Sequence, residues 1–334
     1  RGEPAVTAAP GLVGTGTFAL SKARVLPIEM VAAAWAATGL VLLMLGIGRS
    51  RVGQRMQGYA LLSLSALGTF DQLHKQFITP TDLAWWSALV VGLMYTSAWL
   101  ARSARTRTQD SALLVGFVSA LATLVFAVLQ SHVLANLQIG PAWAATGIAL
   151  LTIGLQRQAA DLRWQSYALF GAAALHTATP ALEPADPSTA AIVWLLAVIL
   201  ALYVCGSIVR RTAASARAAG AELPIDDVAG AIALLGATGL LSALITQQVR
   251  PSATTLVLGL QGLGLMLGGL VTRERILRLS GLALLLACIL KLFLYDLREL
   301  EALARIVSFV ILGLSLLAIS WTYTRYREQI RKFL

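Results

Sequence analysis

Residues 27–48 read PIEMVAAAWAATGLVLLMLGIG, an apolar run with one carboxylate near its start and no other charge. Its length matches the roughly 20 residues that an α-helix needs to cross a hydrocarbon core about 30 Å thick. Similar runs follow along the chain, without the period-two alternation of barrel strands. Because every backbone N–H and C=O must be satisfied inside the bilayer, we interpret these runs as transmembrane helices.

The composition agrees with this interpretation. Hydrophobic residues make up 57% of the 334 residues and charged residues 13%, against about 45–50% and 25% in soluble domains. We therefore expect an all-α polytopic membrane protein. Its eleven spans are predicted at 27–48, 58–77, 83–101, 111–134, 141–155, 164–179, 190–209, 228–249, 252–271, 276–294 and 302–323.

The basic residues predict the orientation of these helices. The net charge is +10, but Lys and Arg are not gathered in the patch that a nucleic-acid partner requires. Most of them follow the odd-numbered spans, and short basic loops of this kind face the cytoplasm. This places the N-terminus outside and the C-terminus in the cytoplasm of a bacterial inner membrane. The residues on the cytoplasmic side are Arg49, Arg51, Arg55, Arg102, Arg105, Arg107, Arg157, Arg163, Arg210, Arg211, Arg217, Arg273, Arg275, Arg278, Arg325, Arg327, Arg331 and Lys332.

An internal repeat predicts how the helices are grouped. The hexapeptide AWAATG at 34–39 recurs at 142–147, and this offset of 108 gives 18 identities in 36 positions. A fainter copy lies at an offset of 223. The first, fifth and ninth spans thus begin equivalent units, which are parallel and four helices long. The expected organisation is a non-membrane segment at 1–26, repeats at 27–134 and 141–249, a partial repeat at 252–323 and a cytoplasmic tail at 324–334.

The last part of the chain resembles a known family. The segments RLSGL at 278–282, KLFLYDL at 291–297, ARIVSF at 304–309 and LGL at 312–314 look like the signature of bacterial predicted membrane proteins with domain of unknown function 2339. The close match spans about 273–327. The resemblance implies a polytopic inner-membrane protein. The family has no established activity, so it assigns no catalytic residue.

Polar residues near the predicted outer helix ends are the candidate functional residues. Ionisable side chains in a membrane span are functional hypotheses by default. One group contains Asp71, His74 and Lys75, and the other contains Lys291, Asp296 and Arg305. They predict either a polar outer vestibule for a ligand or solvated helix ends, where Lys reaches water along its flexible stem. We expect Lys291, Asp296 and Arg305 to form one charge cluster between the last two spans.

Two functions fit this sequence. The first is a non-enzymatic structural or accessory subunit of a cell-envelope or membrane assembly, whose partners are lipids and other membrane-protein subunits. The second is a transporter or lipid-handling protein that uses the outer vestibule. No Walker A, HExxH or GxSxG motif supports an enzyme, and no residue pattern predicts a cofactor or a metal. Cys205 and Cys288 lie in apolar runs, where free thiols behave as small hydrophobic groups.

Overall fold

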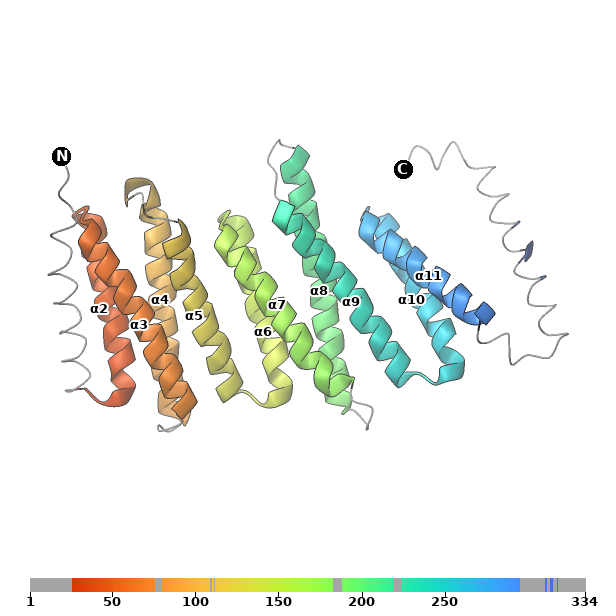
Figure 1. The fold of residues 1–334 in the computed structure, drawn as a ribbon, viewed down its shortest axis with the longest axis horizontal. Coiled ribbons are helices and arrows are strands. Elements are labelled where there is room, and N and C mark those ends of the chain that lie inside the picture. The colour runs from red at the N-terminus through yellow and green to blue at the C-terminus, as the bar shows by residue number, and fades with distance from the viewer. Residues whose placement is uncertain are drawn as a thin grey trace. The chain divides into compact units, whose positions relative to one another are not determined.

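The computed structural model describes residues 26–75, 80–108, 110, 112–182, 188–218, 224–294, 310, 313, 314 and 317. Within these ranges the regular structure is helical (Figure 1). The helices are α2 (Ile28–Gly48), α3 (Val52–Lys75), α4 (Pro80–Thr108), α5 (Ala112–Val133), α6 (Asn136–Gln156), α7 (Ala160–Ala181), α8 (Thr189–Ala218), α9 (Pro224–Gln248), α10 (Pro251–Val271) and α11 (Arg275–Leu294). Each of the first ten predicted spans coincides with one of these helices. Most of the predicted span at 302–323 lies outside the described residues.

Several helices begin earlier than their hydropathy predicts. Helix α3 starts at Val52 instead of residue 58, and α7 starts at Ala160 instead of residue 164. Both first turns carry a buried arginine, Arg55 in α3 and Arg163 in α7. Hydropathy excludes such turns from a span, whereas the backbone hydrogen bonds continue through them.

Seven of the described helices are long and apolar enough to cross a membrane: α2, α4, α5, α6, α8, α9 and α10. Many large apolar side chains on the helices are exposed, such as Leu113 at 84% and Leu175 at 74%. A water-soluble monomer rarely exposes large apolar patches. The exposed surface is therefore typical of helices that face lipid.

The chain divides into two compact units, residues 1–233 and 234–334, with α9 belonging to both. In the first unit the α2–α3 hairpin packs against the α4–α5 hairpin, and α5 contacts the α6–α7 hairpin. The core between the first two hairpins includes Leu43, Leu62, Val90, Met94 and Val118, all almost fully buried. In the second unit α10 packs against α11.

Three hairpins, α2–α3, α6–α7 and α10–α11, share one turn geometry. Ser50, Gln158 and Arg273 have positive φ angles of 54°, 53° and 59°, and their positions differ by the offsets of 108 and 223 found in the sequence. In each turn the backbone N–H of this residue donates to a carbonyl three residues earlier, at 3.3–3.4 Å. The left-handed residue reverses the chain directly after the helix end.

Glycines allow the helices of each hairpin to come close together. A Cβ on Gly46 would lie 2.8 Å from the backbone nitrogen of Arg55, and on Gly154 it would lie 3.2 Å from that of Arg163. Gly269 faces Arg278 in the same way, at 2.7 Å. Real Cβ atoms essentially never lie closer than 3.0 Å to such atoms, so this approach requires glycine in at least the first and third hairpins.

Candidate functional site

The candidate residues from the sequence are only partly described. Asp71 and His74 are exposed near the C-terminal end of α3, where Lys75 is the last helical residue. Lys291 lies on α11 and is half-buried. The side chain of Lys75 and all of Asp296 and Arg305 lie outside the described residues, so the clustering of Lys291, Asp296 and Arg305 stays a prediction.

A buried ion pair instead lies at the Arg-rich end of the first four helices. The Arg55 Nε donates to both carboxylate oxygens of Asp110 at 3.0 Å, and the Tyr59 hydroxyl donates to Oδ2 at 3.1 Å. The side chains of Arg55 and Asp110 are 4% and 3% exposed. We call this arrangement of Arg55, Tyr59 and Asp110 the first clasp. It ties α3 to the residue that precedes α5.

A second clasp has the same three residue types. Arg163 Nη1 lies 2.8 Å from Asp226 Oδ2, although its N–H is not aligned for a hydrogen bond. The Tyr167 hydroxyl donates to Asp226 Oδ1 at 2.9 Å. These residues join α7 to the first turn of α9. Because close charges of opposite sign offset part of each other's desolvation, the acid in each clasp reduces the free-energy cost of burying its arginine.

The sequence contained part of the signal for these clasps. The pairs Arg55/Arg163 and Tyr59/Tyr167 are aligned by the offset of 108. The acids are not, since Asp110 follows its tyrosine by 51 residues and Asp226 by 59. An alignment of the two repeats without gaps therefore does not pair Asp110 with Asp226. From the sequence alone, Arg55 and Arg163 are expected in loops.

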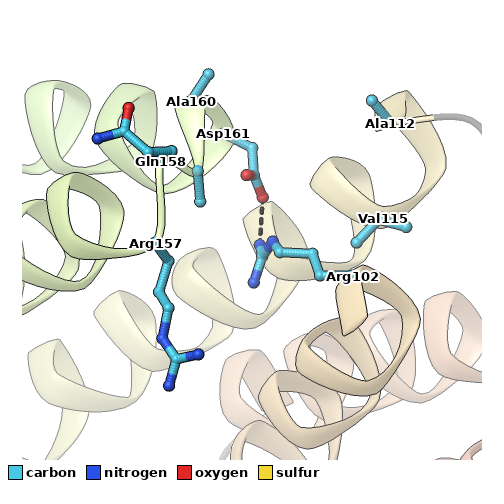
Figure 2. Close-up of a pocket in the computed structure, with 8 residues that line it drawn as sticks. Arg102, Ala112, Val115, Arg157, Gln158, Ala160 and Asp161 are labelled. Atoms are coloured by element: carbon cyan, nitrogen blue, oxygen red, sulfur yellow. Dashed lines mark hydrogen bonds and ion pairs between the residues drawn. The ribbon is translucent and has the colours of Figure 1, made fainter. Parts of the chain in front are cut away.

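A pocket of about 300 Å³ lies where the α4–α5 hairpin meets the turn between α6 and α7. It is lined by Arg102 of α4, the first turn of α5, Arg157 and Gln158 of the turn, and the start of α7 with Asp161. Figure 2 shows the Arg102 guanidinium and the Asp161 carboxylate turned towards each other, and an ion pair joins them. Two arginines and one aspartate are thus among the residues that line the pocket.

A series of hydrogen bonds leads from this pocket between the helices. Ser119 Oγ donates to Asp161 Oδ2 at 2.9 Å, and Gln165 Nε2 donates to Ser119 Oγ at 2.8 Å. Thr123 Oγ1 donates to Gln165 Oε1 at 2.5 Å and is 2.7 Å from the Tyr95 hydroxyl. The hydroxyl groups of Ser119 and Thr123 on α5 therefore bind side chains of α4 and α7, and these bonds connect the first two hairpins to the third.

A further ion-pair group joins the end of α8 to the first turn of α9. Arg210 and Arg217 both donate to the carboxylate of Asp227, at 2.8 and 3.0 Å. Among the residues that the structure describes, no three His, Cys, Asp or Glu side chains are close enough to hold a metal ion. Cys205 and Cys288 are free thiols.

Comparison with known proteins gives one match. A family model described as predicted membrane protein (DUF2339) matches residues 180–326, less than half of the chain. This confirms the resemblance found at the C-terminal end and extends it upstream of residue 273. No curated protein and no solved structure matches the chain. Together with the apolar helices, the match identifies a multi-pass membrane protein of unknown function.

Proposed function

We propose that this chain is a multi-pass protein of the bacterial inner membrane, with eleven spans in parallel four-helix repeats and its C-terminus in the cytoplasm. The shared geometry of the three hairpin turns supports the repeat, because Ser50, Gln158 and Arg273 occupy the same place in successive copies. A parallel orientation is supported by the sequence repeat itself, because the copies at 34–39 and 142–147 each begin a helix–turn–helix hairpin, α2–α3 and α6–α7. The excess of Lys and Arg at one set of helix ends supports the orientation.

Within this architecture, we propose that the protein is a non-enzymatic structural or accessory subunit of a membrane or cell-envelope assembly. The observation that supports this proposal is that the buried arginine and aspartate side chains pair with each other. Arg55, Asp110, Arg163 and Asp226 bind one another and join helices. Charges consumed in this way hold a rigid framework together, whereas a catalytic site or transport path keeps polar groups available to its substrate.

A subunit and a free-standing protein differ in the size of the particle extracted from the membrane. The chain, tagged and expressed at its native level, should migrate on a native gel after mild detergent extraction as a complex larger than the chain purified alone. The same complex should contain another membrane protein in a fixed molar ratio over several preparations. A particle with one chain and lipid alone would contradict the proposal.

The alternative function, a transporter or lipid-handling protein with a polar outer vestibule, is favoured by the exposure of Asp71 and His74 near the end of α3. Purified chain in liposomes should then accelerate the transfer of a fluorescent phospholipid between leaflets, measured by dithionite quenching. The change His74→Ala should remove this activity. A transfer rate equal to that of empty liposomes would contradict the lipid-handling form of the alternative.

A further inference from the structure

We infer that the pocket at the α6–α7 turn binds the phosphate group of an anionic membrane lipid. The inference rests on the proposed membrane location and orientation, which put this pocket at the cytoplasmic headgroup level. Its volume of about 300 Å³ is at the lower end of the range found for small-ligand sites. It therefore accommodates a phosphate headgroup while the acyl chains remain outside.

The charges in the pocket favour an anion. Asp161 is bound by Arg102 and by Ser119, so its negative charge is already compensated. Arg157 is exposed and has no charged partner within the described part of the chain. The pocket therefore keeps one positive charge in excess. A guanidinium presents several N–H donors in a fixed plane, which matches the oxygens of a phosphate group.

The backbone around the pocket adds further donors. Helix α7 begins at Ala160, and no side chain caps it at Ala159. The first N–H groups of a helix have no intrahelical partner and carry a partial positive charge. Ala160 and Asp161, which carry two of these N–H groups, line the same cavity as Arg157, so we expect a bound phosphate to accept hydrogen bonds from both.

Exposed apolar side chains indicate a lipid rather than a soluble anion. Leu113 and Phe117 of α5 are 84% and 55% exposed, and Trp164 of α7 is 51% exposed. They lie within a turn of the lining residues Ala112, Val115 and Asp161. Tryptophan is enriched at the membrane–water interface, and basic pockets between helices on the cytoplasmic side bind anionic lipid headgroups.

A melting experiment on the detergent-solubilised full chain tests this site. Its unfolding temperature is measured at increasing concentrations of dioctanoyl phosphatidylglycerol, of dioctanoyl phosphatidylcholine and of inorganic phosphate. A ligand that binds the folded state raises this temperature. We expect phosphatidylglycerol to stabilise the chain at lower concentrations than either of the other two.

Arg157→Ala should need about tenfold more phosphatidylglycerol for the same stabilisation, the expected effect of losing one charge-assisted hydrogen bond. Arg49→Ala is the matched control. Arg49 follows α2 as Arg157 follows α6, and both are exposed, but Arg49 does not line the pocket. Its response should equal that of the wild type.

Each possible outcome of this experiment either supports the lipid site or overturns it. Equal stabilisation by inorganic phosphate, lost in Arg157→Ala, would keep the phosphate site and assign it to a soluble anion. The inference would be overturned if neither phosphatidylglycerol nor inorganic phosphate stabilised the chain. It would also be overturned if Arg157→Ala responded to phosphatidylglycerol like the wild type. The proposed orientation is tested separately by cysteine labelling, so it can fail while the pocket still binds lipid.

Discussion

Removing Asp110 should destabilise the first unit strongly. The change Asp110→Ala deletes both acceptors of the Arg55 Nε and the partner of the Tyr59 hydroxyl. The guanidinium then loses this carboxylate at a site where the Arg55 side chain is 4% exposed. Breaking a buried pair in this way costs about 3–5 kcal/mol. For a unit of this size the unfolding temperature should fall by roughly 6–20 °C.

The assay is thermal unfolding of detergent-solubilised variants. Arg217→Ala is the control, because it also breaks an Arg–Asp pair, but the Arg217 side chain is 61% exposed and Asp227 keeps Arg210. Such a pair contributes at most about 1 kcal/mol. The double change Arg55→Met with Asp110→Ala should melt above Asp110→Ala, since no charge remains buried. If Asp110→Ala melts within a few degrees of the wild type, the clasp has no structural role.

The remaining predictions concern the turns and the orientation. Gly46→Ala should lower stability by about 1–3 kcal/mol, because its Cβ meets the backbone of the next helix. Gly92→Ala, where a Cβ meets nothing within 4 Å, should be neutral or stabilising by up to about 1 kcal/mol. Equal melting temperatures of Gly46→Ala and Gly92→Ala would refute the argument that Gly46 is needed for close contact between α2 and α3. Gln158→Gly should raise stability by about 1 kcal/mol, since φ is 53° there; a lower melting temperature would count against this strain. In a background without native cysteines, a cysteine at Ser188 should react with an impermeant thiol reagent in intact cells, whereas one at Ser103 should not. The reverse pattern would invert the proposed orientation.

The helices could be predicted from the sequence because their signal is local. An apolar run of about 20 residues in lipid has one way to satisfy its backbone, and the predicted spans from 27–48 to 276–294 each coincide with a helix, although α3, α7 and α11 are not among the seven described helices that are long and apolar enough to cross a membrane. The ends were less predictable. Arg55 lowers the local hydropathy, yet it lies inside α3 because Asp110 offsets the burial of its charge.

The candidate site could not be predicted in the same way. The pocket forms where α4, α5 and the α6–α7 turn come together. The sequence separation of Arg102 and Asp161 does not predict that they form an ion pair. The sequence directed attention to Asp71 and Lys291, because ionisable residues in apolar runs are conspicuous. Buried pairs between distant helices leave no such local pattern.

The first clasp also determines when contacts between the first helices can form during synthesis. Asp110 is synthesised 55 residues after Arg55, which at about 5–20 residues per second is a delay of roughly 3–11 s. During this interval the α2–α3 hairpin is already emerging, while the Asp110 carboxylate that binds the Arg55 Nε has not yet been made. The buried contact between Arg55 and Asp110 can therefore form only after the chain has been made up to Asp110. The packing of α3 among the first four helices is thus completed only once Asp110 has left the ribosome and can reach Arg55.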